Sequence, residues 1–303
     1  MDKSYEYQQL EENNELGVSN SEHSYGQESI SPQNNLKLKK DSAKDIFISV
    51  LPIIGLLVIW HLIAISVTRS RGVPFPTPGQ TFIRFYELLR GDIYLEHTVY
   101  KHLLDSLIRW GSGFLLAAIT GMIVGILIGW SKIFDRLLMP IVYILQPIPS
   151  LAWIPVAILL FGLGGQSTLF IIFLASLFPV IINMAAGVKG VNKMYIRAAR
   201  MMGLEDRSLF FKVLLPGSIP HLLSGFRVSL ANGWRALIAA EMIAAAGSGV
   251  GYSIFQSRWN LDYASAFVNI ILICIVGLII ERLVFTTIES QTIQKWGMKR
   301  EEI

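Results

Sequence analysis

Long apolar stretches separated by short polar segments dominate the chain after residue 45. A helix needs roughly 20 apolar residues to cross a bilayer core of about 30 Å. The charge-free run from 137 to 188 is long enough to cross twice, and the turn-forming residues of 161–167 divide it. The pattern predicts an all-α polytopic membrane protein with six transmembrane helices, at 46–66, 110–130, 137–160, 168–188, 220–245 and 264–286.

Basic residues predict the orientation of these helices, because loops rich in Lys and Arg stay on the cytoplasmic side. An even number of spans places both termini on one side. Segments 161–167 and 247–263 are poor in basic residues and are expected outside. Basic residues gather before the first span, between the second and third, between the fourth and fifth, and after the sixth. We therefore expect a multi-pass protein of the cytoplasmic membrane with both termini in the cytoplasm.

The polar ends of the chain predict its domain organisation. Residues 1–45 are rich in Glu, Asn, Ser and Gln and are expected to form a disordered cytoplasmic tail. The transmembrane domain is expected over 46–290, and a short cytoplasmic tail over 291–303. Segment 67–105 is long and of mixed charge, and it predicts an outer surface helix after the Pro-rich turn 74–78.

Composition narrows the function classes. The chain has 303 residues, of which 52% are hydrophobic and 16% charged, against about 25% charged in soluble domains. The lipid bilayer is the expected surrounding. A formal net charge of +4 is too small to indicate a nucleic-acid partner. Cys274, the single cysteine, excludes an internal disulfide framework and a Cys-rich metal site.

The polar segment between the fourth and fifth apolar stretches, about 190–217, predicts two short helices joined by an elbow. The first is expected over 194–202 and to end at Gly203, since glycine is the usual residue at a helix C-terminus. The second is expected over 205–214 and to end near Pro216. The small residues Ala198 and Ala199 are expected to let another surface approach closely.

This segment resembles the EAA loop of ABC importer permeases, in which Glu-Ala-Ala is followed after three residues by Gly and after nine more by Ile-x-Leu-Pro. Val213 replaces the Ile, and Arg197 stands where the family has Glu, so a contact made by that Glu is not transferred. The strings PIPSLAWIP, LFGLGG and AAEMIAA are similar to the nitrate, sulfonate, taurine and bicarbonate branch. The residues that match in register are Ala198, Ala199, Gly203, Leu215 and Pro216.

The resemblance implies a type I ABC importer permease fold and a set of partners. A permease of this kind forms a dimer, expected here to be a homodimer. It associates with two ABC ATPase subunits inside and with a periplasmic or lipoprotein solute-binding protein outside. The loop containing Arg197 and Gly203 is then the element that couples to the ATPase. The chain has no G-x-x-x-x-G-K-[ST] segment, so ATP hydrolysis is expected in a separate subunit, and no cofactor is expected.

Polar groups inside the predicted spans are candidates for the solute pathway, because ionisable residues in a membrane usually face a cavity or a partner. Each also has a structural alternative, such as an interhelical hydrogen bond. For Arg235 the alternatives are an anionic solute, Glu241 or a neighbouring helix. The four prolines between 140 and 155 prevent the third span from being one straight helix. The pathway candidates are Gln146, Trp153, Asn183, Asn232, Arg235 and Glu241.

Two further questions remain open from sequence. Arg235 and the branch resemblance favour a small anion such as a sulfonate, nitrate or bicarbonate, and a thiamine-related pyrimidine or another small heterocycle is the alternative. An ATP-independent carrier or channel gives no reason for the cytoplasmic loop. A polytopic membrane enzyme would need clustered nucleophiles, metal ligands or paired carboxylates, and the histidines are scattered along the chain.

Overall fold

The computed structural model describes residues 32–245 and 247–285, and side chains are described at 48, 50–245 and 247–282. The chain divides after Val58 into two compact units. The first contributes the N-terminal part of one long helix, and the second contains every other element described here. The predicted tails fall largely on 1–31 and 286–303, which lie outside the described residues.

Helices form nearly all of the described structure, with one short antiparallel hairpin. The elements up to the middle of the chain are α2 (Pro32–Arg71), α3 (Pro78–Leu89), β1 (Ile93–Tyr94), β2 (His97–Thr98), α4 (Val99–Trp130), α5 (Lys132–Leu145), η1 (Ser150–Trp153) and α6 (Ile154–Phe161). The later elements are α7 (Gly165–Gly190), α8 (Lys193–Met201), α9 (Asp206–Leu209), the π-helical η2 (Phe210–Leu214), α10 (Leu215–Ala244), α11 (Val250–Trp259), α12 (Tyr263–Ile279) and the π-helical η3 (Ile280–Phe285).

The prediction of a six-span all-α membrane protein is confirmed. Five of the described segments are long and apolar enough to cross a membrane: Val50–Arg71, Val99–Trp130, Gly165–Gly190, Asp206–Ala244 and Tyr263–Arg282. The sixth is a broken pair, Lys132–Leu145 with Ser150–Phe161, bent by 91°. The surface helix expected after the Pro-rich turn is α3, which Thr77 begins with a capping box to Gln80.

Three predicted boundaries are wrong. Residues 32–45 are helical and open α2, because this polar stretch contains no glycine and its proline lies in the first turn. Helix α4 begins at Val99, well before residue 110, so its first turns carry charged residues. The second short helix of the elbow does not end near Pro216, since α9 and η2 continue directly into α10. Pro216 lies shortly after the π-helical turn η2, where the i to i−4 hydrogen-bond pattern of the helix is already interrupted.

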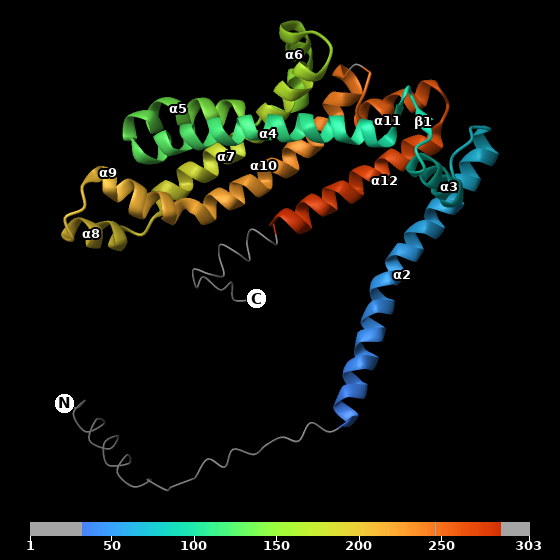
Figure 1. Cartoon of the computed structure of the whole chain (residues 1–303), viewed down its shortest axis with the longest axis horizontal. Helices are drawn as coiled ribbons and strands as arrows, with labels where there is room; N and C mark the ends of the chain where they lie inside the picture. Colours follow the sequence, from blue (N-terminus) through green and yellow to red (C-terminus); the bar gives the residue numbers. More distant parts are fainter. Residues whose placement is uncertain (1–31, 246, 286–303) are drawn as a thin grey trace, which may run out of the picture. The chain divides into compact units, whose positions relative to one another are not determined.

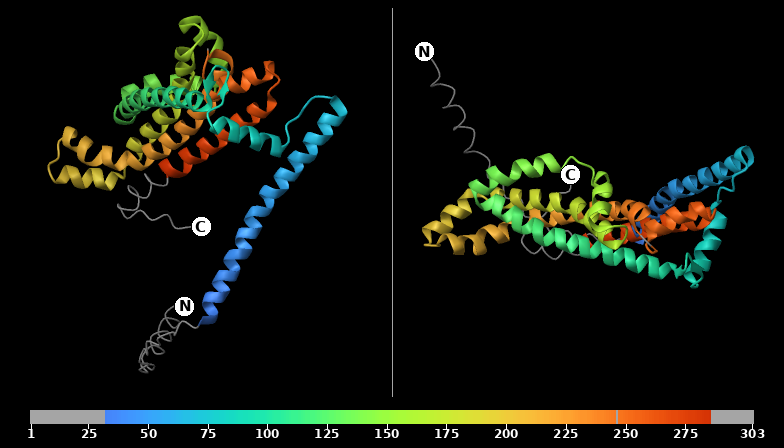
Figure 2. Two further views of the ribbon diagram at one scale, coloured as in Figure 1. Left: turned by 45° about the vertical axis from the view of Figure 1, so that its right-hand side comes forward. Right: turned by 90° about the horizontal axis from the view of Figure 1, so that it is seen from above.

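Helix α7 packs against α4 on one side and α10 on the other (Figure 1). The elbow formed by α8 and α9 lies at one end of these helices, and the β1–β2 hairpin and α11 lie at the opposite end (Figure 2). The two segments that sequence placed on opposite sides of a membrane, 190–217 and 247–263, are therefore at opposite ends of the bundle.

Small residues every fourth position allow α4 to approach α7 closely. A Cβ added at Gly121 would lie 2.8 Å from Cβ of Val180, and one added at Gly125 would lie 2.6 Å from Cβ of Met184. One added at Gly129 would lie 2.5 Å from Cβ of Val188. Close packing of small residues is how membrane helices associate. The small-residue stripe on α4 thus serves packing within one chain.

Helix α10 meets the other side of α7 in the same manner. Gly225 lies against Asn183, where an added Cβ would be 2.7 Å from the side chain. Ser176 and Ser229 exchange hydrogen bonds, each hydroxyl donating to the other residue's carbonyl at 3.2 and 2.6 Å. These contacts fix the register of α7 and α10.

Candidate functional site

The break in the third span opens a cavity. Helix α5 ends at Leu145 with Gln146 as its C-cap, and Pro147 and Pro149 cannot donate the backbone hydrogen bonds that would continue it. The chain resumes as η1 and α6 at an angle of 91° to α5. Non-helical backbone within a membrane span is tolerated where it lines a cavity. The bend therefore creates a hollow bordered by η1, α7 and α10.

This first cavity has a volume of about 360 Å³. It contains four of the six pathway candidates, which come from segments far apart in sequence. Gln146 and Trp153 border the break, and Asn232 and Arg235 lie on α10. The remaining lining residues are Pro147, Ile148, Pro149, Ser150, Leu151, Leu174, Ala175, Phe178, Pro179 and Ala236. The wall is largely apolar, with a few convergent polar groups, as in most small-molecule sites.

Arg235 supplies the positive charge of the first cavity. Its Nε donates to the carbonyl of Ala231, one turn back along α10, at 3.2 Å, and the side chain is otherwise exposed. Among the residues that the structure describes, no carboxylate lies within ion-pair distance of its guanidinium. An arginine held by its Nε keeps two terminal nitrogens that can bind a planar oxyanion in bidentate fashion.

Asn183 and Glu241, the other two candidates, do not line the first cavity. The amide of Asn183 donates to the carbonyl of Pro179 at 2.8 Å and packs against Gly225 of α10. Glu241 is fully buried near the far end of α10. Of the alternatives for Arg235, pairing with Glu241 is excluded in this structure, since Glu241 pairs with a different arginine.

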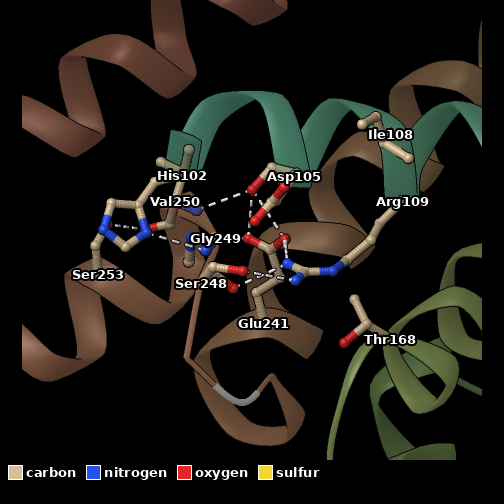
Figure 3. Close-up of polar contacts among 12 residues, drawn as sticks. His102, Asp105, Ile108, Arg109, Thr168, Glu241, Ser248, Gly249, Val250 and Ser253 are labelled. Carbon is tan, nitrogen blue, oxygen red and sulfur yellow. Dashed lines mark hydrogen bonds and ion pairs between the residues drawn. The ribbon is translucent and has the colours of Figure 1, made fainter. Parts of the chain in front are cut away.

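That arginine is Arg109 of α4, whose Nη1 lies 2.8 Å from Oε1 of Glu241 (Figure 3). The carboxylate also accepts hydrogen bonds from the Ser106 hydroxyl at 2.8 Å and from the backbone N–H of Gly251 at 3.0 Å. Glu241 thus has a charged partner and two further donors, as a buried carboxylate requires.

The same cluster fastens the loop between α10 and α11 onto α4. Arg109 donates to the Ser248 carbonyl and hydroxyl at 2.9 Å each. The Val250 N–H donates to Ser106 at 2.8 Å. At Gly249, whose φ is +128°, an added Cβ would lie 2.6 Å from the Glu241 carboxylate, so only glycine fits. We call this set of contacts the α4–α10 clamp.

His102 extends the α4–α10 clamp to the hairpin. Its Nδ1 accepts the Gly249 N–H at 3.1 Å, so the ring proton lies on Nε2, which donates to the Tyr94 carbonyl at 3.0 Å. The Tyr94 hydroxyl bonds Ser257 and donates to the Ser253 carbonyl at 3.3 Å. Burial raises the pKa of Tyr94 to about 12, because the phenolate would lose its hydration.

Sequence reasoning missed Arg109, because it began the second span at residue 110. The spacing of polar residues before Gly113 nevertheless held a signal for Arg109. His102, Ser106 and Arg109 continue the three- and four-residue spacing of the small-residue stripe that starts at Gly113. Positions with this spacing lie on one helix face, so the sequence places these polar groups on the inward face of α4. There they meet α10 and the loop after it, whereas the small-residue stripe meets α7.

The elbow has the cap that its sequence predicted. Gly203 has φ +80°, its N–H donates to the Arg200 carbonyl at 3.0 Å, and the Leu204 N–H donates to the Ala199 carbonyl at 3.1 Å. These two bonds make a Schellman motif, which needs a left-handed residue. Nothing lies within 4 Å of a Cβ added at Gly203.

The exposed surface of the elbow differs from the prediction. Ala199 is only 2% exposed, since it lies on the inner side of α8, so no partner can approach it directly. Arg197 and Ala198 are exposed. Leu215 and Pro216 are half-buried where α10 begins. The large exposed apolar residues here are Met194, Tyr195, Met201 and Met202, which sequence reasoning did not single out.

Comparison with known proteins gives a consistent result. Residues 117–289 match the family described as "Binding-protein-dependent transport system inner membrane component". A putative ABC transporter permease of Methanocaldococcus jannaschii is 33% identical over 246 residues, covering 80% of this chain and 90% of the relative.

Two cyanobacterial relatives have named solutes. The bicarbonate transport system permease CmpB of Synechocystis is 31% identical over 242 residues, covering 78% of this chain and 86% of that protein. The nitrate import permease NrtB of the same organism is 31% identical over 233 residues, covering 76% and 83%. Among solved structures, the MetNI methionine ABC transporter gives a TM-score of 0.51 at 19% identity. The match covers 71% of this chain and 97% of that one, a likeness of fold.

Proposed function

Because this chain belongs to the family of binding-protein-dependent transport system inner membrane components, we propose that its pathway carries a small oxyanion of the bicarbonate or nitrate class. As a member it is the membrane-spanning permease subunit of an ABC importer, a multi-pass transport component of the inner membrane and not an enzyme. Its family works with ATPase subunits and a solute-binding protein. The solute, the pathway residues and the coupling surface are proposals.

The observation that carries the proposal is the guanidinium of Arg235 at the first cavity. A cation within the bilayer is costly unless it has a counter-charge or water. No described carboxylate lies within ion-pair distance of Arg235, so a passing anion is a suitable counter-charge. Relatives named for bicarbonate and nitrate transport support this choice.

The neighbouring groups suit the same solutes. The amides of Gln146 and Asn232 can each donate to an oxyanion and also accept from the hydroxyl of bicarbonate. Trp153 adds a large apolar surface that excludes water beside the charge. We assign these residues to the pathway with Arg235. Asn183 and Glu241 instead hold helices together.

The elbow is proposed as the contact for the ATPase. Met194, Tyr195, Met201 and Met202 offer an exposed apolar surface, since each is at least two-thirds exposed. Methionine adapts its shape to a partner and is common at protein contacts. Arg197 and Ala198 complete the exposed side, and Gly203, Leu215 and Pro216 fix its geometry. Ala199 supports the elbow from within.

The elbow and the hairpin lie at opposite ends of the bundle, and this supports the proposed orientation in the membrane. With the elbow inside, both termini are cytoplasmic, and the hairpin and α11 face the solute-binding protein outside. A symmetric homodimer is the proposed assembly, because identical subunits most often close about a two-fold axis. We expect the detergent-extracted complex to have the mass of two permeases and two ATPases.

Uptake of labelled bicarbonate and nitrate tests the proposed solute class. Arg235→Gln should lower uptake roughly tenfold or more, because charged hydrogen bonds are lost, and Arg235→Lys should retain part of it. The ATPase should co-purify normally with both variants. Arg136→Gln on α5 is the control and should transport normally, since this exposed arginine lies outside the first cavity. Unchanged anion uptake by Arg235→Gln, or uptake of a pyrimidine in its place, would falsify the proposal.

A further inference from the structure

A second cavity, of about 390 Å³, lies between α10 and α12. Arg235 lines this cavity as well as the first, so one guanidinium borders both. The other residues that define it are Arg227, Leu230, Ala231, Trp234, Ile273, Cys274, Gly277, Leu278, Ile280 and Glu281. Apart from Arg235, the residues that line this cavity have no role in the proposed pathway.

Two arginines follow one face of α10 along this cavity. Arg227, Ala231 and Arg235 are spaced by four residues, so they lie on neighbouring turns of the helix. The two arginines are separated by roughly 12 Å along the axis, at 1.5 Å per residue. Arg227 lies toward the elbow end of α10, which makes the second cavity the inner one in the proposed orientation.

Arg227 is loosely paired with Glu281 of η3. The distance from Nη2 to Oε1 is 3.9 Å, longer than a hydrogen bond, and the side chains are 48% and 64% exposed. Exposed ion pairs of this kind are weak, so an incoming anion can compete with the Glu281 carboxylate. The tight Arg109–Glu241 pair, at 2.8 Å and buried, offers no such exchange.

Trp234 adds a donor that has no acceptor. Its side chain is only 7% exposed, and its Nε1 has no hydrogen-bond partner among the described residues. Gly277 of α12, another residue of the cavity wall, would place an added Cβ 3.4 Å from this nitrogen. Buried N–H groups are nearly always bonded, so an unpartnered indole beside two arginines points to a ligand that accepts hydrogen bonds.

We propose that the second cavity is a second anion site of this permease, loaded from the first through Arg235. The proposal rests on the proposed anion function and adds an inner stage to it. The anion leaves the first cavity with the Arg235 side chain, is bound by the Trp234 N–H, and displaces Glu281 from Arg227 before its release. Weak binding at each of two successive sites allows a solute both to enter the pathway and to leave it.

Cys274 provides a reporter, since it is the single cysteine of the chain, is exposed and lines the second cavity. The full-length permease in phosphatidylcholine nanodiscs is labelled with an anionic or a cationic methanethiosulfonate of similar size. We expect the anionic reagent to react several times faster, because two arginines border the cavity. Sodium nitrate should slow the labelling more than sodium gluconate at equal ionic strength.

Substitutions separate the contributions of the lining residues. Arg227→Gln and Arg235→Gln should each lower the preference for the anionic reagent by roughly threefold, and Glu281→Gln should raise it by a similar factor. Trp234→Phe keeps an aromatic side chain, although a smaller one, and removes the N–H, so nitrate protection should weaken while the reagent preference stays. Arg258→Gln, outside both cavities, should leave both measurements unchanged.

The outcomes distinguish this site from the proposed function. If nitrate gives no protection and Arg227→Gln transports normally while Arg235→Gln does not, the second site is wrong and the first stands. Protection by an anionic lipid in the nanodisc, without protection by nitrate or bicarbonate, also overturns it, since the cavity then binds a headgroup. Normal anion uptake by Arg235→Gln with intact nitrate protection at Cys274 would instead remove the proposed role of the first cavity.

Discussion

Glu241 of α10 and Arg109 of α4 form an ion pair of 2.8 Å in which the carboxylate is wholly buried and the guanidinium is 16% exposed. The two residues are 132 positions apart in sequence. Together with Ser106 and Gly251 they join the two long helices α4 and α10 to the start of α11. Their contribution is therefore to the stability of this end of the bundle.

Removal of one member of this pair should be costly. Glu241→Gln keeps a side chain of the same shape but leaves the Arg109 charge without its partner, which destabilises by about 3 kcal/mol. Thermal unfolding in detergent, followed by tryptophan fluorescence, should show a clearly lower midpoint. The double variant Arg109→Gln/Glu241→Gln should recover part of the loss. Equal midpoints for wild type and Glu241→Gln would contradict the clamp.

The effect of a substitution at Gly203 should depend on the backbone conformation that the new residue prefers, and not on the size of its side chain. At φ +80° a β-branched residue is strained, so Gly203→Val should destabilise the elbow by roughly 1–2 kcal/mol. Gly203→Asn should be milder, because asparagine adopts this conformation more readily. Co-purification of the ATPase should fall for Val and remain for Asn, with equal permease abundance. The same loss for both would indicate that the added side chain blocks a contact.

The glycines of α4 should differ according to what they face. Gly125→Ala places a methyl group 2.6 Å from Cβ of Met184 and should destabilise the α4–α7 contact by about 1–3 kcal/mol. Gly111 on the same helix has nothing within 4 Å, so Gly111→Ala should be neutral or stabilising. Melting midpoints of the two variants in one detergent provide the comparison. A neutral Gly125→Ala would mean that the two helices separate easily.

The proposed orientation is tested with two exposed positions at opposite ends of the bundle. Met202 in the elbow is 73% exposed, and Leu261 after α11 is 68% exposed. Each is replaced by cysteine in a Cys274→Ser background. An impermeant thiol reagent added to intact cells should label Leu261→Cys and spare Met202→Cys, and inside-out vesicles should reverse the result. Labelling of the elbow from outside would overturn the orientation.

The sequence was most informative where local chemistry decides the structure. The capping of Gly203, the helix after Thr77 and the break of the third span at Pro147 and Pro149 all follow from residues within one turn. Four of the six pathway candidates, near Pro147 and on the fifth span, line the first cavity, and their role in the pathway stays a prediction.

The parts that sequence did not predict depend on contacts between distant segments. No local signal pairs Glu241 with Arg109, since any cation at the right depth on a neighbouring helix would serve. The burial of Ala199 depends on how α8 folds back toward the rest of the elbow, so the composition of that loop did not predict which of its two alanines is exposed.

The uninterrupted run from α9 through η2 to α10 has a mechanical consequence. It spans 39 residues, about 58 Å at 1.5 Å per residue, which is nearly twice the thickness of the hydrocarbon core. The run is therefore longer than a perpendicular crossing needs, and its α9 and η2 residues belong to the elbow end of the bundle. Glycine contacts and reciprocal serine bonds leave α7 no room to slide against α4 or α10. The expected consequence of the proposed coupling is that a displacement of the elbow moves α4, α7 and α10 together, and that the side chains around Arg235 change their surroundings.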